Sequence, residues 1–235
     1  MTRNRKPLLM TLATVLFFSS VCADDLKDGM EAAKNQDYVT ALKKFQIAAS
    51  QGEANAQFNI GLMYGTGKGI AKDYSEAARW YRLSAVQGHP SAQLNLGTLY
   101  QNGQGVLQDY AEAMRWYKLA ASQGEPSAQF NIGVMFDEGL GVVQNPTESI
   151  RWYKLAAGQG DASAQNNLAI KYALGTGVVQ DYTRAHMWLN LSAVNGNAGA
   201  VKVRDLVAAK MTTQQIAEAQ KLARECQARN FKDCD

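Results

Sequence analysis

The chain has 235 residues, of which 46% are apolar and 19% are charged. This composition is typical of a folded protein with enough apolar side chains for an extended core, and it excludes an intrinsically disordered chain. The formal net charge of +3 falls to 0 once a basic N-terminal segment, described next, is removed. The charge therefore gives no indication of nucleic-acid binding.

The first 23 residues predict a secretory signal that is cleaved after Ala23. Three basic residues, Arg3, Arg5 and Lys6, precede an apolar run of 11 residues, and small residues follow it. This is the order that export requires. The run is short against the roughly 20 residues of a membrane-spanning helix, and no later stretch is longer or more apolar. We therefore expect a periplasmic or secreted protein with no membrane span.

Two other interpretations of this segment stay open. The first is an amphipathic start to the fold. The second is a lipoprotein signal, because Cys22 stands where a lipid could be attached. Val21 counts against that second interpretation, since lipoprotein signals usually have a small residue at this place.

Two cysteines, Cys226 and Cys234, are left after cleavage. An even number of cysteines in a chain bound for an oxidising compartment predicts a disulfide, which would fix the last residues of the chain. Free buried thiols are the alternative.

A 36-residue period organises the rest of the chain. Five units open on an Asp or Asn residue with no insertion or deletion between them: Asp37, Asp73, Asp109, Asn145 and Asp181. A period of this length predicts stacked helix pairs, each completed by its neighbour. We expect an all-α fold, an α/α superhelix (solenoid) of helix-turn-helix repeats over residues 37–210. A capping helix over residues 24–36 would precede it, and a capping helix with a tail over residues 211–235 would follow.

The first helix of each unit has a clear start and stop. The opening Asp or Asn is a good N-cap, and a glutamate three residues on can bond back to it, as at Glu76, Glu112 and Glu148. Glycines that favour a left-handed stop follow the helix, at Gly88, Gly124, Gly160 and Gly196.

The second helix carries "AQFNIG" or a close variant in the first four units. Its glycines Gly61, Gly97 and Gly133 stand mid-helix, where glycine costs about 1 kcal/mol relative to alanine. We expect a close helix crossing to be the reason, and Ala169 replaces the glycine in the fourth unit. The Gly-x-Gly pairs that follow could suggest a phosphate-binding loop. They follow helices rather than strands and recur in every unit, so we interpret them as turns.

These motifs resemble the Sel-one-like repeat (SLR) family, relatives of the tetratricopeptide repeats. The resemblance rests on the 36-residue unit, the Ala-x-x-x-Φ-Gly-x-x-Tyr pattern, the Gly-x-Gly-Val loop and the "WYxxAAxQG" helix, and it covers roughly residues 24–210. It implies a superhelix that serves as an adaptor for protein assemblies, often in the bacterial envelope or at a host interface. The closing segment, with Thr212 and Gln215 as a capping box, resembles the end helix of such arrays.

The alternative from another class is an enzyme that acts on β-lactams or cell-wall fragments. Cysteine-rich members of the resembled family have been described as β-lactamases or penicillin binders, but the cysteine pair they carry in most repeats is absent here. The chain has no Ser-x-x-Lys, Gly-x-Ser-x-Gly or His-Glu-x-x-His motif. Of its two histidines, His89 falls in a turn and His186 at a position held by apolar residues in other units. We expect no catalytic residue, no cofactor and no metal.

Three sets of recurring side chains are candidates for recognition. The asparagines Asn59, Asn95, Asn131 and Asn167 either satisfy loop backbone groups, which we favour, or grip a peptide. Four tryptophans recur at one position. They either pack between repeats, which we favour, or line the bottom of a binding groove: Trp80, Trp116, Trp152 and Trp188. Two basic positions recur on the first helices, Arg79, Arg115 and Arg151 at one and Arg82, Lys118 and Lys154 at the other.

The basic positions have two interpretations. Glutamates three residues before Arg79, Arg115 and Arg151 could neutralise that set as a solvated face, each pair contributing about 0.2–0.5 kcal/mol. The second set has no such carboxylate in its own helix, so an acidic partner could bind there. In relatives of the resembled family the first helices line the concave side of the superhelix. We expect a non-enzymatic scaffold that binds a protein or peptide on this concave face, and no nucleic acid. The partner-binding hypothesis comprises both basic sets with Trp80, Trp116 and Trp152.

Overall fold

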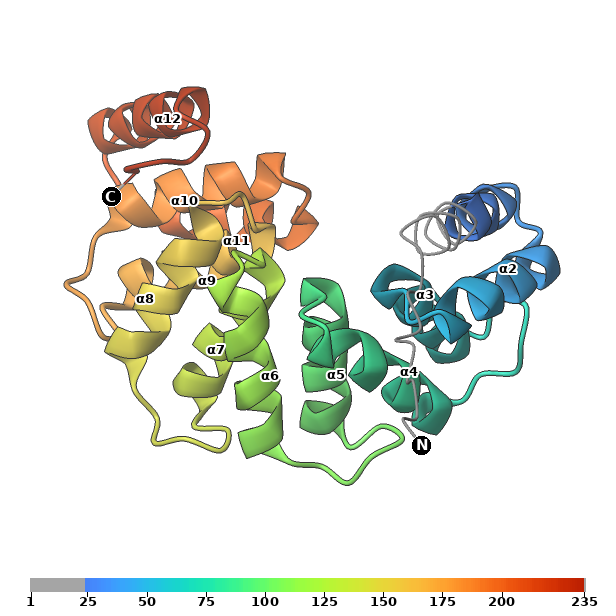
Figure 1. The fold of residues 1–235 in the computed structure, drawn as a ribbon. Helices are drawn as coiled ribbons and strands as arrows, with labels where there is room; N and C mark the ends of the chain where they lie inside the picture. Colours follow the sequence, from blue (N-terminus) through green and yellow to red (C-terminus); the bar gives the residue numbers. More distant parts are fainter. Residues whose placement is uncertain (1–23, 235) are drawn as a thin grey trace, which may run out of the picture. The chain divides into compact units, whose positions relative to one another are not determined.

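The computed structural model of the protein describes residues 24–234, and this part of the chain is helical, with no strand (Figure 1). The predicted signal and its alternatives lie outside these residues. A helix over residues 24–34 comes first. The helices that follow are α2 (Tyr38–Ser50), α3 (Ala54–Thr66), α4 (Tyr74–Val86), α5 (Pro90–Asn102), α6 (Tyr110–Ser122), α7 (Pro126–Glu138), α8 (Pro146–Ala157), α9 (Ala162–Leu174), α10 (Tyr182–Val194), α11 (Ala198–Ala208) and α12 (Thr213–Ala228). The predicted all-α class and the helix-turn-helix repeats are confirmed.

The helices form two compact units. The first unit holds the described residues up to Ala92 together with Gln104–Val106, and the second holds Gln93–Gly103 together with the chain from Leu107 onward. Within the units, the first helix of a repeat packs mainly on the second helix of the repeat before it, as α4 does on α3, α8 on α7 and α10 on α9.

The predicted N-caps are present. The Asp73 carboxylate accepts hydrogen bonds from the backbone N–H groups of Ser75 and Glu76 at 2.8 and 3.1 Å. Asp109 caps α6 in the same way, and Asp37, Asn145 and Asp181 each accept one backbone N–H at the start of their helices. The glutamates that we expected to bond back to the caps bind arginines instead, as described below. The glycine stop is also confirmed, for example at Gly124 with φ +88°.

The mid-helix glycines are explained by a tyrosine of the next first helix. A Cβ atom on Gly97 would lie 2.7 Å from Cε1 of Tyr117, closer than such atoms approach. Gly61 and Gly133 meet Tyr81 and Tyr153 in the same way. In the fourth unit Ala169 replaces glycine, and the residue in the register of these tyrosines is Leu189. The expected close helix crossing is therefore a contact between a glycine and a tyrosine ring. Where the second helix has Ala169, the first helix has the smaller Leu189 in place of the tyrosine.

A ladder of buried amides joins one repeat to the next. A glutamine or asparagine after each first helix donates its side-chain N–H to a buried glutamine 30 residues earlier, at 2.8 to 2.9 Å. The pairs are Gln87 with Gln57, Gln123 with Gln93, Gln159 with Gln129 and Asn195 with Gln165. Each pair satisfies two polar groups that would otherwise be costly to bury.

The preferred asparagine prediction is wrong for Asn59 and Asn167. Asn167 donates its side-chain N–H to the Tyr153 hydroxyl at 3.3 Å. Asn59 bonds to the carbonyl of Asn55 in its own helix at 2.8 Å. These amides bind a neighbouring side chain and the helix itself, not loop backbone groups.

Polar side chains also meet beside Tyr153. Lys171 forms an ion pair with Asp137, and the side chains of these two residues are 12% and 22% exposed. The Tyr153 hydroxyl donates to Asp137 at 3.5 Å, and burial raises the pKa of this phenol. Other repeats place the apolar Met63, Leu99 and Met135 in the register of Lys171. The ion pair is therefore a local variation on an apolar packing position.

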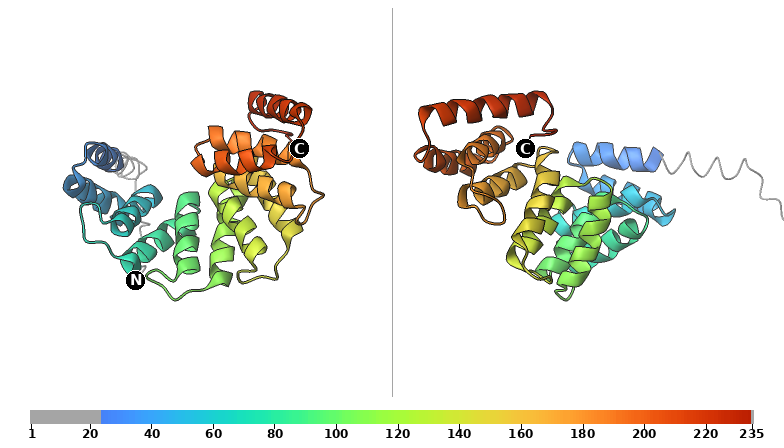
Figure 2. Two further views of the ribbon diagram at one scale, coloured as in Figure 1. Left: turned by 180° about the vertical axis from the view of Figure 1, so that it is seen from behind. Right: turned by 90° about the vertical axis from the view of Figure 1, so that its left-hand side faces the viewer.

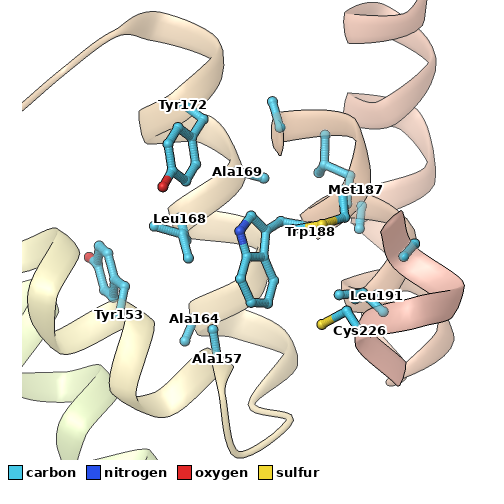
Figure 3. Packing of buried hydrophobic residues seen from close by; sticks show 14 of the residues in the cluster. Tyr153, Ala157, Ala164, Leu168, Ala169, Tyr172, Met187, Trp188, Leu191 and Cys226 are labelled. Atoms are coloured by element: carbon cyan, nitrogen blue, oxygen red, sulfur yellow. The ribbon is translucent and has the colours of Figure 1, made fainter. Parts of the chain in front are cut away.

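The second unit has its largest described core between α8 and α12 (Figure 3). Trp188 lies against Ala164 and Leu168 of α9, and only 2% of its surface is exposed. On the other side of α10, Leu191 faces Cys226 of α12. This tryptophan packs between repeats, as the preferred interpretation expected.

The C-terminal helix departs from the stacking of the repeats. α12 packs mainly against α10 (Figures 1 and 2), and Thr212 with Gln215 forms the predicted capping box before it. The predicted disulfide between Cys226 and Cys234 is present, with 5.2 Å between the Cα atoms. The disulfide closes a loop whose Phe231 ring lies against Gly160.

Candidate partner-binding face

The exposed side of the first helices carries basic and aliphatic side chains in register. On α6 these are Arg115, Lys118 and Leu119, and on α8 they are Arg151, Lys154 and Leu155. We call this set the first-helix face; α4 of the first unit carries the same residue types at its own corresponding positions, Arg79, Arg82 and Leu83. Leu83, Leu119 and Leu155 are 40%, 40% and 47% exposed, so water covers a good part of three large aliphatic side chains.

The arginines of the face are paired within their own helices. Arg115 donates from Nη2 and Nε to the Glu112 carboxylate at 2.9 and 3.2 Å, and this carboxylate raises the pKa of the guanidinium. Arg79 binds Glu76 at 2.9 Å in the same way. The pair of Arg151 with Glu148 is longer, 3.4 Å, and the Arg151 side chain is 73% exposed. The neutralising pairs that we weighed from the sequence are thus present, and the third is the weakest.

The second basic position carries Arg82, Lys118 and Lys154. Lys118 is exposed on α6, and no ion pair of it is found within residues 24–234. The ammonium group of Lys154 lies 5.7 Å from the centre of the Tyr172 ring. Arg82 lines a hollow of about 280 Å³ in the first unit, together with Arg79, Leu83 and Val106. The structure therefore places these three basic groups on exposed helix surface.

Two of the tryptophans lie beneath the neighbouring arginine. The guanidinium carbon of Arg115 is 4.1 Å from the centre of the Trp116 ring, and that of Arg79 is 4.7 Å from the Trp80 ring. Only 4% of Trp116 is exposed. The ring is a packing surface that supports the arginine, so Trp116 would act on a partner through Arg115.

The indole N–H groups differ between repeats. Trp152 donates from Nε1 to Oε1 of Glu148 at 3.1 Å. The Nε1 atoms of Trp80 and Trp116 are buried and have no hydrogen-bond acceptor among the described residues. A buried donor without an acceptor is rare and costs free energy.

Sequence reasoning missed a second apolar feature. Leu107, Val143 and Val179 of the Gly-x-Gly loops are 90%, 88% and 85% exposed. Large aliphatic side chains so fully in water at one register are candidates for contact with another protein. The sequence feature that could have revealed them is an apolar residue that recurs every 36 residues within a turn.

Neither histidine has the surroundings of a catalytic group. His89 stacks on Phe58 at 4.6 Å and its Nδ1 accepts the backbone N–H of Ala92 at 3.3 Å, so it caps α5. His186 is 3% exposed and its Nδ1 lies 3.0 Å from the Asn190 side-chain nitrogen. Burial lowers the pKa of both imidazoles. Between residues 24 and 234 no three His, Cys, Asp or Glu residues gather as metal ligands would.

The family model of the Sel1 repeat matches the chain four times, at residues 54–89, 90–125, 126–161 and 162–197. The chain belongs to the Sel1 repeat family. Each matched repeat begins at a second helix, half a unit after the Asp or Asn that opens the units of the sequence analysis. Sel1 repeats commonly mediate contacts between proteins.

Solved structures support the same assignment. A Sel1 repeat protein from Oxalobacter formigenes is 37% identical, with a TM-score of 0.76, over 83% of this chain and 78% of that one. The c5321 protein, a protective antigen of uropathogenic Escherichia coli with an SLR fold, is 32% identical with a TM-score of 0.77. That match covers 92% of this chain but only 48% of the antigen, so the chain spans about half the length of that relative. The predicted solenoid fold is confirmed.

A more distant likeness shows the fold alone. Immunity protein Pa5087 from Pseudomonas aeruginosa is 20% identical, with a TM-score of 0.53, over 91% of this chain and 83% of that one. A search among proteins of curated function found no match. No helix in the described part of this chain has the length and apolar character to cross a membrane.

Proposed function

We propose that this Sel1 repeat protein is a non-enzymatic scaffold of the periplasm or the extracellular space that binds an acidic protein or peptide on its first-helix face. One observation carries the proposal. On α6 and again on α8, a lysine and a half-exposed leucine stand side by side in the sequence, Lys118 with Leu119 and Lys154 with Leu155, on helices held in place by buried cores. A surface that offers both charge and apolar area is suited to a protein partner.

The charges of the face favour an acidic partner. Exposed ion pairs such as Arg115 with Glu112 contribute little, about 0.2–0.5 kcal/mol, so a partner carboxylate can displace them at small cost. Lys118 and Lys154 add two more positive charges to the face. The attraction acts over about 8 Å at physiological salt, so binding should weaken as salt is added.

The proposed location rests on two features. The N-terminal 23 residues have the order of a secretory signal. The disulfide between Cys226 and Cys234 belongs to an oxidising compartment. A protein exported to such a compartment would meet its partner there.

Crosslinking of the tagged mature protein in its own cell envelope, followed by mass spectrometry, tests the proposal. We expect one dominant protein, crosslinked near Lys118 or Lys154. The triple variant Arg82→Glu, Lys118→Glu and Lys154→Glu should lose the capture, and the salt dependence with it.

The matched control is the double variant Lys202→Glu and Lys210→Glu, which reverses exposed charges outside the first-helix face. It should capture the partner as the natural protein does. Equal capture by the triple variant, with unchanged salt dependence, would remove the first-helix face as the site. Turnover of a chromogenic β-lactam by the purified protein, lost in a point variant, would replace the scaffold by an enzyme.

A further inference from the structure

We infer that the glutamate of each Glu-x-x-Arg-Trp segment can exchange one hydrogen-bond donor for another. When a partner carboxylate binds the arginine, the glutamate leaves the arginine and accepts the indole N–H of the tryptophan instead. The inference deepens the proposed function and rests on it, because it assigns the chemistry of one subsite on the first-helix face. Each segment is treated within its own helix: Glu112, Arg115 and Trp116 on α6, and Glu148, Arg151 and Trp152 on α8.

The first observation is the unpartnered N–H on α6. Trp116 is 4% exposed, and its Nε1 atom is buried with no acceptor among the described residues. Because the atom is covered, an acceptor has to come from a neighbouring side chain of the protein rather than from a partner. Glu112 stands four residues before Trp116, the spacing at which side chains of one helix face meet. Its carboxylate is held by Arg115 instead, through three contacts of 2.9 to 3.2 Å.

The second observation is that α8 has the other arrangement. Glu148 accepts the Trp152 N–H at 3.1 Å, and its contact with Arg151 lengthens to 3.4 Å. Arg151 is correspondingly the most exposed arginine of the three pairs, at 73% against 53% for Arg115 and 55% for Arg79. The same residue types at the same spacing thus adopt both states in one chain. On α8 the carboxylate reaches both groups through Oε1, and when it accepts the tryptophan N–H it keeps the arginine by a single, longer contact.

The third observation is that α4 repeats the α6 state. Trp80 Nε1 is buried without an acceptor, and Glu76 binds Arg79 through Nε and Nη2 at 3.1 and 2.9 Å. Two of the three segments therefore keep the arginine occupied and the indole unsatisfied.

The exchange makes the face selective for carboxylates. A partner carboxylate replaces Glu112 on Arg115 with the same two-pronged geometry. The displaced Glu112 then accepts the Trp116 N–H, so the charge pair lost within the helix is offset by a hydrogen bond that was missing. A neutral peptide cannot displace Glu112 and gains nothing from the buried N–H. The ligand class is an acidic peptide segment with carboxylate side chains.

Nuclear magnetic resonance of the indole N–H groups tests this directly. The probe is an oligoglutamate peptide added to the nitrogen-15-labelled mature protein at low salt, with oligoglutamine as the neutral control. Resonances are assigned with single Trp→Phe variants. The Trp116 N–H resonance should move downfield toward that of Trp152 on saturation, as an indole does when it gains an acceptor, while the Trp152 resonance stays in place.

Two variants separate exchange from a general effect of charge. In Glu112→Ala the peptide should bind at least as tightly, because Arg115 is free, but the Trp116 resonance should no longer move. In Glu148→Ala the Trp152 resonance of the free protein should move upfield, which gives the position of an unbonded indole. Glu112 and Glu148 are partly exposed, so neither change removes a core group.

The outcomes distinguish this inference from the proposed function. If oligoglutamate binds and depends on Lys118 and Arg115, but the Trp116 resonance does not move, the exchange is refuted and the acidic-partner face stands. A shift that persists in Glu112→Ala also refutes the exchange, since the acceptor is then not Glu112. If oligoglutamate binds no better than oligoglutamine, both the face and the exchange are refuted.

Discussion

Replacing Gly97 by alanine tests the glycine–tyrosine contact between repeats. The new Cβ would stand 2.7 and 2.8 Å from Cε1 and Cδ1 of Tyr117, where at least about 3.4 Å is comfortable. The ring cannot simply swing away. It is 1% exposed, and its hydroxyl is held by Gln101 at 2.8 Å and Thr98 at 3.2 Å.

The magnitude follows from two opposing effects. Overpacking of a close-packed core costs about 1–3 kcal/mol, and alanine returns about 1 kcal/mol of helix propensity relative to glycine. We therefore expect Gly97→Ala to lower the free energy of unfolding by about 1–2 kcal/mol, because the steric cost exceeds the propensity gain. Urea unfolding followed by circular dichroism measures it, as a lower midpoint at an unchanged slope.

A second substitution identifies the cause. Tyr117→Leu copies the Ala169 and Leu189 pair, so the double variant Gly97→Ala with Tyr117→Leu should be more stable than the sum of the single effects. Gly65→Ala is the control, since its Cβ would stand 3.3 Å from the nearest atom, the Tyr81 hydroxyl, a much smaller overlap than at Gly97, so it should lower stability less than Gly97→Ala does. A Gly97→Ala protein as stable as the natural one would refute the steric explanation.

Three further predictions concern single sites. Because the pKa of folded His89 lies below its unfolded value of about 6.5, the unfolded chain takes up a proton first as the pH falls. Stability should drop below about pH 6.5, and His89→Asn, which keeps an N-cap, should lose less in acid melts. Opening the Cys226 disulfide by Cys234→Ser should cost about 2.5 kcal/mol by the chain-entropy relation for a separation of 8 residues, measured by urea unfolding; no change would show that the tail adds nothing. Lys171→Met should cost about 1–3 kcal/mol in thermal or urea melts by stranding the Asp137 carboxylate, and Asp137→Gln added to it should restore stability.

Local chemistry was predicted from the sequence well, and contacts between repeats were not. Asp73 as an N-cap, Gly124 as a left-handed stop and the disulfide depend on residues close in the chain, so the order of letters suffices. The partner of Gly97 is 20 residues away, and only the crossing of two helices shows that it is the Tyr117 ring. The sequence indicated a packing reason without its chemistry.

The candidate site shows the same division. The pairing of Arg115 with Glu112 was predicted because three-residue spacing on a helix brings them together. The choice of Glu148 for Trp152 was not, since it depends on rotamers of three neighbouring side chains. The preference for loop backbone as the partner of Asn167 was wrong, because the nearest hydroxyl belongs to a tyrosine of another helix. Leu107 was overlooked because apolar residues were assigned to the core by default.

The glycine–tyrosine contacts also bear on how the gene can change. Repeats of equal length invite unequal recombination, which removes or adds whole units. A deletion that joins one glycine-bearing second helix to any tyrosine-bearing first helix preserves a working contact. Joining the helix of Ala169 to such a first helix would press a methyl group into a tyrosine ring. The helix of Ala169 therefore fits only the first helix that carries Leu189. We expect repeats to be gained or lost before this junction, so that variation in repeat number among close relatives occurs upstream of Ala169.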